Sequence, residues 1–160
     1  MERATHVPVL LDEVRTLLEP GRGGTFVDCT LGLGGHSRML LESGATRVIG
    51  IDRDTDAIAI AKQSLAEFGD RVTFVHADYR EVADVLDAQG VAEVAGLLAD
   101  LGVSSMQLDA DGRGFSFKRD EPLDMRMDRS RGETAADLLD RVDETELADV
   151  IYRFGEERRS

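Results

Sequence analysis

The sequence predicts an α/β protein built on an open, parallel, doubly wound sheet. Four short apolar runs alternate with segments of helical periodicity, which is the order that right-handed strand–helix–strand crossovers produce. Each run ends on an acidic residue or just before one, at Asp28, Asp52, Asp78 and Asp100. Ligands bind such sheets outside the carboxyl ends of the strands, so the four acids predict a ligand site at that edge. For any one of them, a structural role in a turn or at a helix N-cap is the alternative.

The first strand, expected over 25–30, runs into a glycine-rich turn and then into a helix. Glycines at 32, 34 and 35 suit a backbone that approaches a ligand closely. A dinucleotide fingerprint needs the spacing G-x-G-x-x-G, and its third glycine, counted from Gly32, falls on Ser37. The acid four residues before Gly32 suits a ligand that carries a positive charge. The loop therefore favours a cationic, amino-acid-like cofactor over a dinucleotide.

The other elements follow from apolar periodicity and from stop signals. A helix is expected over 7–19, with Pro8 at its first position, before a glycine-rich turn over 20–24. Further helices are expected over 36–43, 54–69 and 81–89, with strands over 47–51, 71–75 and 94–99. After Gly102 an irregular stretch over 103–133 precedes two short helices capped by Thr134 and Asp143. The chain does not return to the sheet, so we expect the front part of a longer protein.

The composition narrows the class of protein. Acidic residues outnumber basic ones, 32 to 19, for a net charge of −13, which argues against non-specific coating of nucleic acid. The stretch 113–131 is an exception, with six basic and four acidic side chains, and is compatible with one specific nucleic-acid contact.

The single cysteine, Cys29, is expected to be a small buried residue. His6, His36 and His76 lack ligand spacing, so no metal site is predicted. Without a membrane-spanning run or a signal peptide, a cytoplasmic protein with no membrane contact is expected.

Five separated blocks of sequence resemble the successive motifs of one family. In chain order they are His6-Val-Pro-Val-Leu-Leu-Asp-Glu-Val14, Asp28-Cys-Thr-Leu-Gly-Leu-Gly-Gly-His-Ser37, Gly50-Ile-Asp-Arg-Asp54, Asp100-Leu-Gly-Val-Ser-Ser105 with Gln107-Leu-Asp109, and Arg113-Gly-Phe-Ser-Phe117 with Leu123-Asp-Met-Arg-Met-Asp128. By these motifs the chain resembles the bacterial RsmH/MraW family of ribosomal small subunit RNA (cytosine-N4)-methyltransferases. The resemblance runs from Thr5 to the last residue.

The resemblance implies S-adenosylmethionine as methyl donor and a Rossmann-like methyltransferase fold, of which this chain holds an incomplete sheet. It implies a methyltransferase core over 1–105 and the beginning of an inserted helical substrate-recognition domain over 106–160. The reaction would be N4-methylation of a cytidine in the decoding region of 16S ribosomal RNA, with the small ribosomal subunit as partner. Family members are longer, so a truncated, non-catalytic fragment that binds cofactor or RNA is the alternative. The oligomeric state is left open, with a homodimer as one option.

The resemblance also assigns cofactor contacts. Gly34, Gly35 and His36 resemble the loop around the methionine end, where Asp28 is expected to hold the ammonium group directly or through water. Asp52 follows Gly34 by 18 residues, close to the offset of roughly 20 at which an acid binds ribose hydroxyls. Asp78 and Tyr79 follow the third strand, where the fold places the adenine, and the tyrosine ring could stack on it. The family match adds Asp100 and Gln107. Alternatives are a capping role for His36 and plain packing for Tyr79.

Methyl transfer to cytosine N4 requires a positioned group that accepts a hydrogen bond from the amino group. The cytosine N4 lone pair is delocalised into the ring, and a carboxylate that accepts from the amino group would orient it and favour the charge that develops on attack. Our hypothesis gives this catalytic role to Asp100, with Ser104 or Ser105 helping to hold the base, in a direct transfer from sulfur to nitrogen. Amino methyltransferases commonly carry an Asp/Asn/Ser-Pro-Pro-aromatic motif here, and this chain has Asp100-Leu-Gly-Val instead.

The base edge must be exposed, so the target is a single-stranded or flipped nucleotide. Candidates for phosphate contacts are Arg113, Lys118, Arg119, Arg126 and Arg129, each with an ordinary solvated charge as the alternative. Phe115 and Phe117 either join this surface or form core of the inserted domain. A nucleotide-dependent oxidoreductase is a third reading, disfavoured by the missing third glycine and by the acid before the loop.

Overall fold

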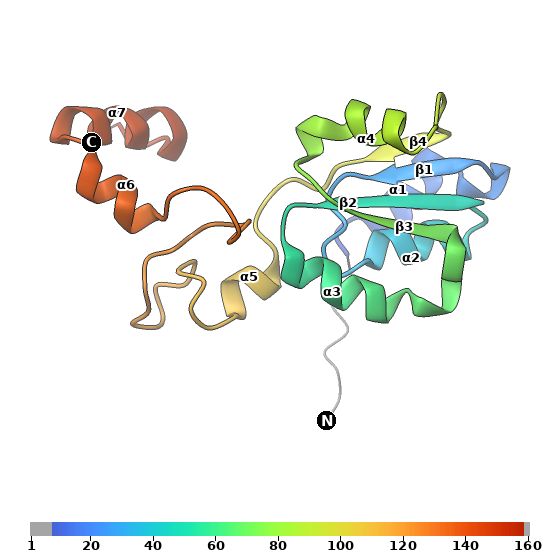
Figure 1. The fold of residues 1–160 in the computed structure, drawn as a ribbon, viewed down its shortest axis with the longest axis horizontal. Coiled ribbons are helices and arrows are strands. Elements are labelled where there is room, and N and C mark those ends of the chain that lie inside the picture. The colour runs from blue at the N-terminus through green and yellow to red at the C-terminus, as the bar shows by residue number, and fades with distance from the viewer. Residues whose placement is uncertain (1–7, 159–160) are drawn as a thin grey trace. The chain divides into compact units, whose positions relative to one another are not determined.

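The computed structural model describes residues 8–158. The chain divides into two compact units, with the division between Gly102 and Val103. The first unit holds a sheet with its helices, and the second holds three short helices and a long irregular stretch (Figure 1).

The first unit is built on a four-stranded parallel sheet in the order β3-β2-β1-β4. The strands are β1 (Thr25–Asp28), β2 (Arg47–Asp52), β3 (Val72–His76) and β4 (Gly96–Leu98). All pairs are parallel, so the four carboxyl ends lie at one edge. The strand order reverses direction between β3 and β4, which makes the gap between β1 and β4 the topological switch point. The predicted doubly wound α/β fold is confirmed.

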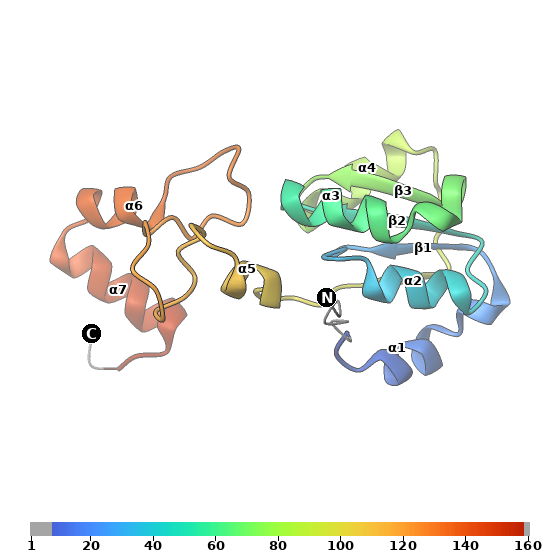
Figure 2. The same cartoon turned by 90° about the horizontal axis from the view of Figure 1, so that it is seen from below.

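Helices cover both faces of this sheet (Figure 2). Helices α1 (Leu11–Leu18), α2 (Gly35–Glu42) and α3 (Thr55–Ser64) pack on one face, and α4 (Val82–Ala88) packs on the other. Short 3-10 turns are η1 (Pro20–Arg22), η2 (Ala66–Arg71) and η3 (Tyr79–Glu81). The helix predicted over 54–69 is therefore two pieces, α3 and η2, which meet at Leu65 with φ −101° and ψ 9°. Gly69, with a positive φ of 51°, adds a kink inside η2.

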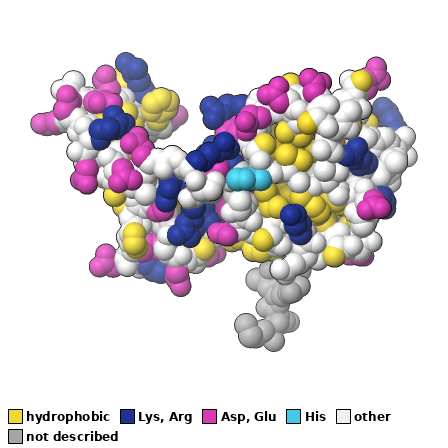
Figure 3. All heavy atoms as spheres, in the orientation of Figure 1, with side chains coloured by type: hydrophobic (Ala, Val, Ile, Leu, Met, Phe, Trp, Pro, Cys, Tyr) yellow, Lys and Arg dark blue, Asp and Glu magenta, His cyan; other side chains and the backbone are white. Residues whose placement is uncertain are grey.

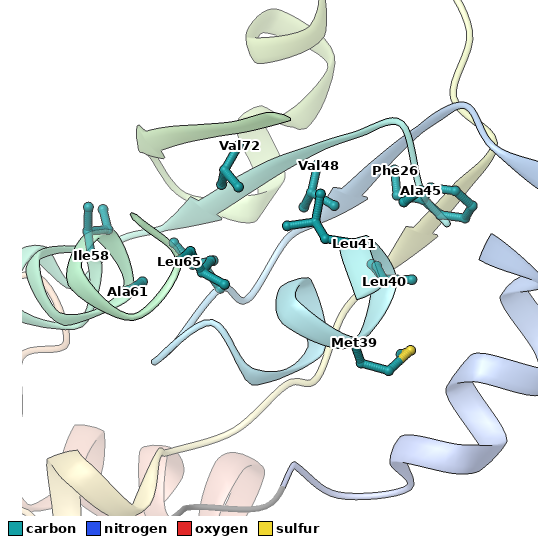
Figure 4. Close-up of a cluster of buried hydrophobic side chains, with 11 residues drawn as sticks. Phe26, Met39, Leu40, Leu41, Ala45, Val48, Ile58, Ala61, Leu65 and Val72 are labelled. Atoms are coloured by element: carbon teal, nitrogen blue, oxygen red, sulfur yellow. The ribbon is translucent and has the colours of Figure 1, made fainter. Parts of the chain in front are cut away.

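The core has two halves because neighbouring strand residues point to opposite faces. Figure 4 shows the larger half, in which α2 and α3 side chains meet Phe26, Val48 and Val72 of three neighbouring strands. On the other face, Val27 and Ile49 pack with α4. The strands are thus buried on both sides, as in α/β sheets covered by crossover helices.

The first helix begins later than predicted. It starts at Leu11, so Pro8 precedes it instead of opening it, and residues 1–7, including His6, lie outside the described part. Leu10 takes a left-handed backbone with φ 54°. Pro8 packs against Gly35, where an added Cβ would clash with the proline Cγ. Contacts with the glycine loop therefore hold residues 8–10 outside the helix that their sequence favours.

The second unit contains α5 (Ser105–Asp109), α6 (Ala135–Arg141) and α7 (Glu144–Gly155). The predicted caps of the last two are confirmed, because the side chains of Thr134 and Asp143 accept from backbone N–H groups in the first turn. Helix α5 was not predicted, although Ser104 and Gln107 carry the S-x-x-Q spacing of a capping box.

The surface is mixed in charge. On the face shown in Figure 3, Asp and Glu side chains occur on both units with Lys and Arg among them.

Cys29 is 5% exposed, which confirms the predicted buried residue, and burial raises the pKa of its thiol to about 11. Within residues 8–158 no helix is long and apolar enough to cross a membrane, and no cluster of His, Cys, Asp and Glu could hold a metal ion.

Candidate binding site at the carboxyl edge of the sheet

Asp28 organises the glycine loop from within the protein. It is fully buried, and its carboxylate accepts from the Ser37 hydroxyl at 2.8 Å and from the Thr30 N–H at 3.2 Å. Burial raises the pKa of Asp28, and the two hydrogen bonds oppose that shift. A carboxylate without exposed surface cannot touch a ligand, so the predicted direct contact of Asp28 with an ammonium group is wrong. Ser37, which marked only a missing glycine in the sequence, ties α2 to the end of β1.

Asp52 joins the glycine loop to the end of β2. One carboxylate oxygen accepts from the Gly32 N–H at 2.8 Å, and the other accepts from the Asp54 N–H at 2.9 Å. Each oxygen keeps a further lone pair, because an ionised carboxylate has about four acceptor sites. The residue is half-buried, so these sites can accept from the hydroxyls of a ligand at the edge of the sheet.

The loop is also tied to the end of β4. The Thr30 hydroxyl accepts from the Asp100 N–H at 2.7 Å. Asp100 is exposed, and within residues 8–158 its carboxylate accepts no hydrogen bond. The structure therefore brings the glycine loop, Asp52 and Asp100 together around the switch point. Sequence reasoning missed Thr30, whose one signal is its place between Asp28 and Gly32.

The N-terminus of α2 lacks a side-chain cap. Gly34 is the N-cap residue, in a left-handed conformation with φ 87°. The first N–H groups of a helix have no acceptor within the helix, so those of Gly35 and His36 suit an anion such as a carboxylate. The His36 ring is 6% exposed and donates from Nε2 to the Val9 carbonyl at 3.0 Å. Its ring thus holds the segment before α1, which leaves the backbone N–H for a ligand.

Gly34 is held by its neighbours as well as by its backbone angle. An added Cβ would lie 2.8 Å from Leu65 Cδ1, whereas a Cβ at Gly90, which also has a positive φ, would meet nothing within 4 Å. We expect Gly90→Ala to cost about 1–2 kcal/mol of unfolding free energy for the left-handed backbone alone. Gly34→Ala should cost a further 1–3 kcal/mol, roughly, for overpacking against α3. Urea denaturation measures both, and equal losses would contradict the close approach at Gly34.

At the end of β3, Asp78 has a structural role. It caps η3 and forms a capping box with Glu81. Its carboxylate accepts from Arg80 Nε and Nη2, both at 2.9 Å, and from Arg53 Nη1 at 3.2 Å. The Arg80 guanidinium holds the pKa of this carboxyl well below its usual range. The N-cap alternative is thus confirmed for Asp78, while the neighbouring Tyr79 is 41% exposed and keeps ring surface for stacking.

Gln107 belongs to the second unit, unlike the other predicted cofactor contacts. Its side-chain Oε1 accepts from the Ser104 N–H at 3.0 Å, and its own N–H donates to the Ser104 hydroxyl at 3.2 Å. The predicted role of Ser104 in holding a base therefore competes with its role as the cap of α5.

Three of the five predicted phosphate-binding cations bond within the second unit. Arg113 is 2% exposed and donates to two backbone carbonyls at 3.1 and 3.2 Å, so its predicted phosphate contact is wrong. Arg126 donates two hydrogen bonds, of 2.8 and 2.9 Å, to the Asp124 carboxylate. These hydrogen bonds lower the pKa of the Asp124 carboxyl to about 2. Arg119 donates to carbonyls at the end of α5. The two cations without such contacts in the described residues are Lys118 and Arg129.

The fold defines a doubly wound α/β protein, and this edge is its candidate small-ligand site at the switch point. A model of the MraW methylase family matches residues 3–160. The chain therefore belongs to the MraW methylase family, which confirms the resemblance found in the five motifs.

Two curated relatives match nearly the whole of this chain. The ribosomal RNA small subunit methyltransferase H of Sorangium cellulosum is 59% identical over 97% of this chain and 49% of its own length. The protein of the same name from Parafrankia is 53% identical over 96% of this chain and 48% of its own. The chain thus spans about half the length of the curated relatives it matches. Among solved structures, an SAM-dependent O-methyltransferase from Thermotoga maritima is 24% identical with a TM-score of 0.42, covering 51% of this chain and 32% of that one.

Proposed function

We propose that this protein is an S-adenosylmethionine-dependent methyltransferase that methylates N4 of a cytidine in the decoding region of 16S ribosomal RNA. One observation carries the proposal beyond family membership. An uncapped helix N-terminus at Gly34 and the acceptor Asp52 converge on the switch point, with the exposed carboxylate of Asp100 on the adjoining strand. The helix N–H groups can donate to a carboxylate, and the carboxylates of Asp52 and Asp100 can accept from hydroxyls and an amino group. This combination suits a zwitterionic nucleoside better than a pyrophosphate.

The residues of the edge fit S-adenosylmethionine group by group. The N–H groups of Gly35 and His36 would bind the methionine carboxylate, next to Gly34, whose own N–H donates to the Leu31 carbonyl at 2.8 Å, and Asp52 would accept from the ribose hydroxyls. The half-exposed ring of Tyr79 would stack on the adenine. We also assign Gln107 and Asp100 to the cofactor site. When bound, the cofactor supplies an electrophilic methyl group on its sulfonium.

In this proposal Asp28 does not contact the ligand but positions the residues around it. Its buried carboxylate fixes Ser37 and Thr30, and Thr30 in turn holds the backbone of Asp100. Through these contacts the end of β1 sets the distance between the glycine loop and the reacting edge. Asp28 is a positioning residue.

Asp100 is the proposed catalytic residue. Its exposed carboxylate would accept a hydrogen bond from the cytosine amino group, turn the N4 lone pair toward the methyl group and stabilise the positive charge that develops on nitrogen. The proton lost from N4 then passes to solvent or to this carboxylate. Catalysis here consists of orientation and electrostatics.

The remaining assignments follow the same proposal. The methyltransferase core is taken as residues 1–105 and the beginning of an inserted substrate-recognition domain as 106–160. The partner is the small ribosomal subunit, the compartment is the cytoplasm, and a homodimer is one oligomeric option. Since relatives are about twice as long, a cofactor- or RNA-binding fragment is the alternative.

Cofactor titration followed by methyl transfer tests the proposal. Calorimetric titration of the purified protein with S-adenosylmethionine should show one site, and NADH under the same conditions should not bind. Tritiated methyl groups should then pass to small subunits from cells that lack this modification, but not to subunits that already carry it. Binding without transfer would leave the fragment alternative. NADH binding in place of S-adenosylmethionine would contradict the proposal.

A further inference from the structure

The second unit carries a loop over 112–121 that is closed at its base. The Glu121 carboxylate accepts from the N–H groups of Gly112 at 2.6 Å and Gly114 at 3.2 Å, so one side chain joins the two ends of the loop. Arg119 donates from Nη2 to the carbonyls of Leu108 at 3.2 Å and Asp109 at 2.9 Å, which fastens the loop to the end of α5. These contacts limit the positions that the loop can take.

The anchored loop exposes one aromatic ring. Phe117 is 97% exposed, more than any other large apolar side chain in the described residues, whereas Phe115 is half-buried. The sequence left both rings open between core and surface, and the structure assigns Phe117 to the surface. Exposing a whole Phe side chain forgoes about 1.5–3 kcal/mol of burial.

A cation with no competing partner stands next to this ring. Lys118 is exposed, its backbone N–H donates to the Ser116 hydroxyl at 3.3 Å, and its ammonium makes no hydrogen bond or ion pair within residues 8–158. The neighbouring Arg119 is engaged with backbone carbonyls, as described above. The tip of the loop therefore combines one bare π face with one unpaired positive charge.

We propose that Phe117 and Lys118 form an RNA contact, in which the ring stacks on an unpaired base and the ammonium binds a phosphate beside it. The inference rests on the proposed function, which supplies an RNA substrate, and it adds a contact that the cofactor site does not contain. Base stacking on an aromatic ring is worth about 1–3 kcal/mol per base and tolerates any base. The contact would therefore contribute affinity and leave the choice of nucleotide to the reacting site.

The surroundings of the ring favour RNA over a protein partner. A protein-docking surface usually needs a contiguous apolar patch of a few hundred Å². Here the chain neighbours of Phe117 are Ser116 and Lys118, followed by Arg119 and Asp120. A single ring with polar neighbours along the chain suits a base and its phosphate, which together present one flat face and one negative charge.

Variants of the ring test this contact in the purified protein. Filter binding of unmodified small-subunit ribosomal RNA measures affinity, and calorimetry measures S-adenosylmethionine binding. Phe117→Ala should weaken RNA binding by about fivefold to 150-fold, which is the stacking energy converted at 1.4 kcal/mol per tenfold change. Its Kd for S-adenosylmethionine should stay unchanged. Lys118→Gln should lower the dependence of log Kd on log salt by about 0.7.

Two matched variants separate stacking from other effects of removing an apolar group. Phe117→Trp keeps a ring and should retain RNA affinity, while Phe117→Leu keeps apolar volume and should lose it. Phe154→Ala removes a ring on α7 that is 82% exposed and should change nothing. RNA affinity that survives in Phe117→Ala or in Phe117→Leu would overturn the contact.

These experiments distinguish a failure of the proposed RNA contact from a failure of the proposed methyltransferase function. If the wild-type protein methylates subunits and Phe117→Ala binds RNA equally well, only the contact is overturned. If ring-dependent RNA binding occurs without methyl transfer, the contact stands and the proposed activity falls. If the wild-type protein binds no RNA, both fall.

Discussion

Asp100→Asn is expected to lower the rate of methyl transfer, at saturating cofactor and RNA, by about 10²–10⁴-fold. The amide has nearly the shape of the carboxylate, so the backbone hydrogen bond from Asp100 to Thr30 should persist. What is lost is the negative charge that orients the cytosine amino group and stabilises charge on nitrogen. A single-turnover assay with tritiated cofactor measures this step, and calorimetry should show a Kd for S-adenosylmethionine changed by less than about tenfold, since one hydrogen bond is altered.

A matched control for this variant is Asp70→Asn. Asp70 is an exposed acid just before β3, at the amino ends of the strands and thus at the opposite edge of the sheet. The same chemical change there should leave the rate unaltered. If Asp100→Asn kept full turnover with normal cofactor binding, Asp100 would not be the catalytic residue.

The second large effect is expected for Asp52→Ala. The variant loses the proposed acceptor for the ribose hydroxyls and leaves the N–H groups of Gly32 and Asp54 without their acceptor. Hydrogen bonds to a charged group are worth about 1.5–3 kcal/mol, so the Kd for S-adenosylmethionine should rise by roughly 10- to 100-fold. The rate at saturating cofactor should change much less, because Asp52 does not touch the reacting atoms in this proposal.

Asp52→Asn distinguishes ligand binding from loop support. The amide oxygen can still accept from one of the two backbone N–H groups, so the unfolding free energy should lie between those of the wild-type protein and Asp52→Ala. Calorimetry gives the cofactor Kd and urea denaturation gives stability. Unchanged cofactor affinity in Asp52→Ala would contradict the assignment of this residue to the ribose.

Much of the fold could be predicted from the sequence because each element carries a local signal. The alternation of apolar runs and helical periodicity gave the sheet and its crossovers, and the caps at Asp54, Thr134 and Asp143 lie where their spacing indicates. The family motifs gave the family, which the match over residues 3–160 confirms. The cofactor contacts stay predictions.

The roles of individual charges could not be predicted, because they depend on partners distant in sequence or on burial. Asp28 looked like a ligand group until its burial and its bond to Ser37 were known. Arg113 looked like a phosphate contact and is buried against backbone carbonyls. The start of α1 depends on Pro8 packing against a glycine 27 residues away. A pattern of residue types contains none of these contacts.

Mass spectrometry of the modified nucleoside tests the central claim most directly. Unmodified small subunits are incubated with the protein and S-adenosylmethionine, the 16S ribosomal RNA is digested, and the methylated product is identified and located. The account predicts N4-methylcytidine at one position in the decoding region. A methyl group on a ring carbon, on a ribose oxygen or on another base would contradict it, because Asp100 is assigned to an exocyclic amino group.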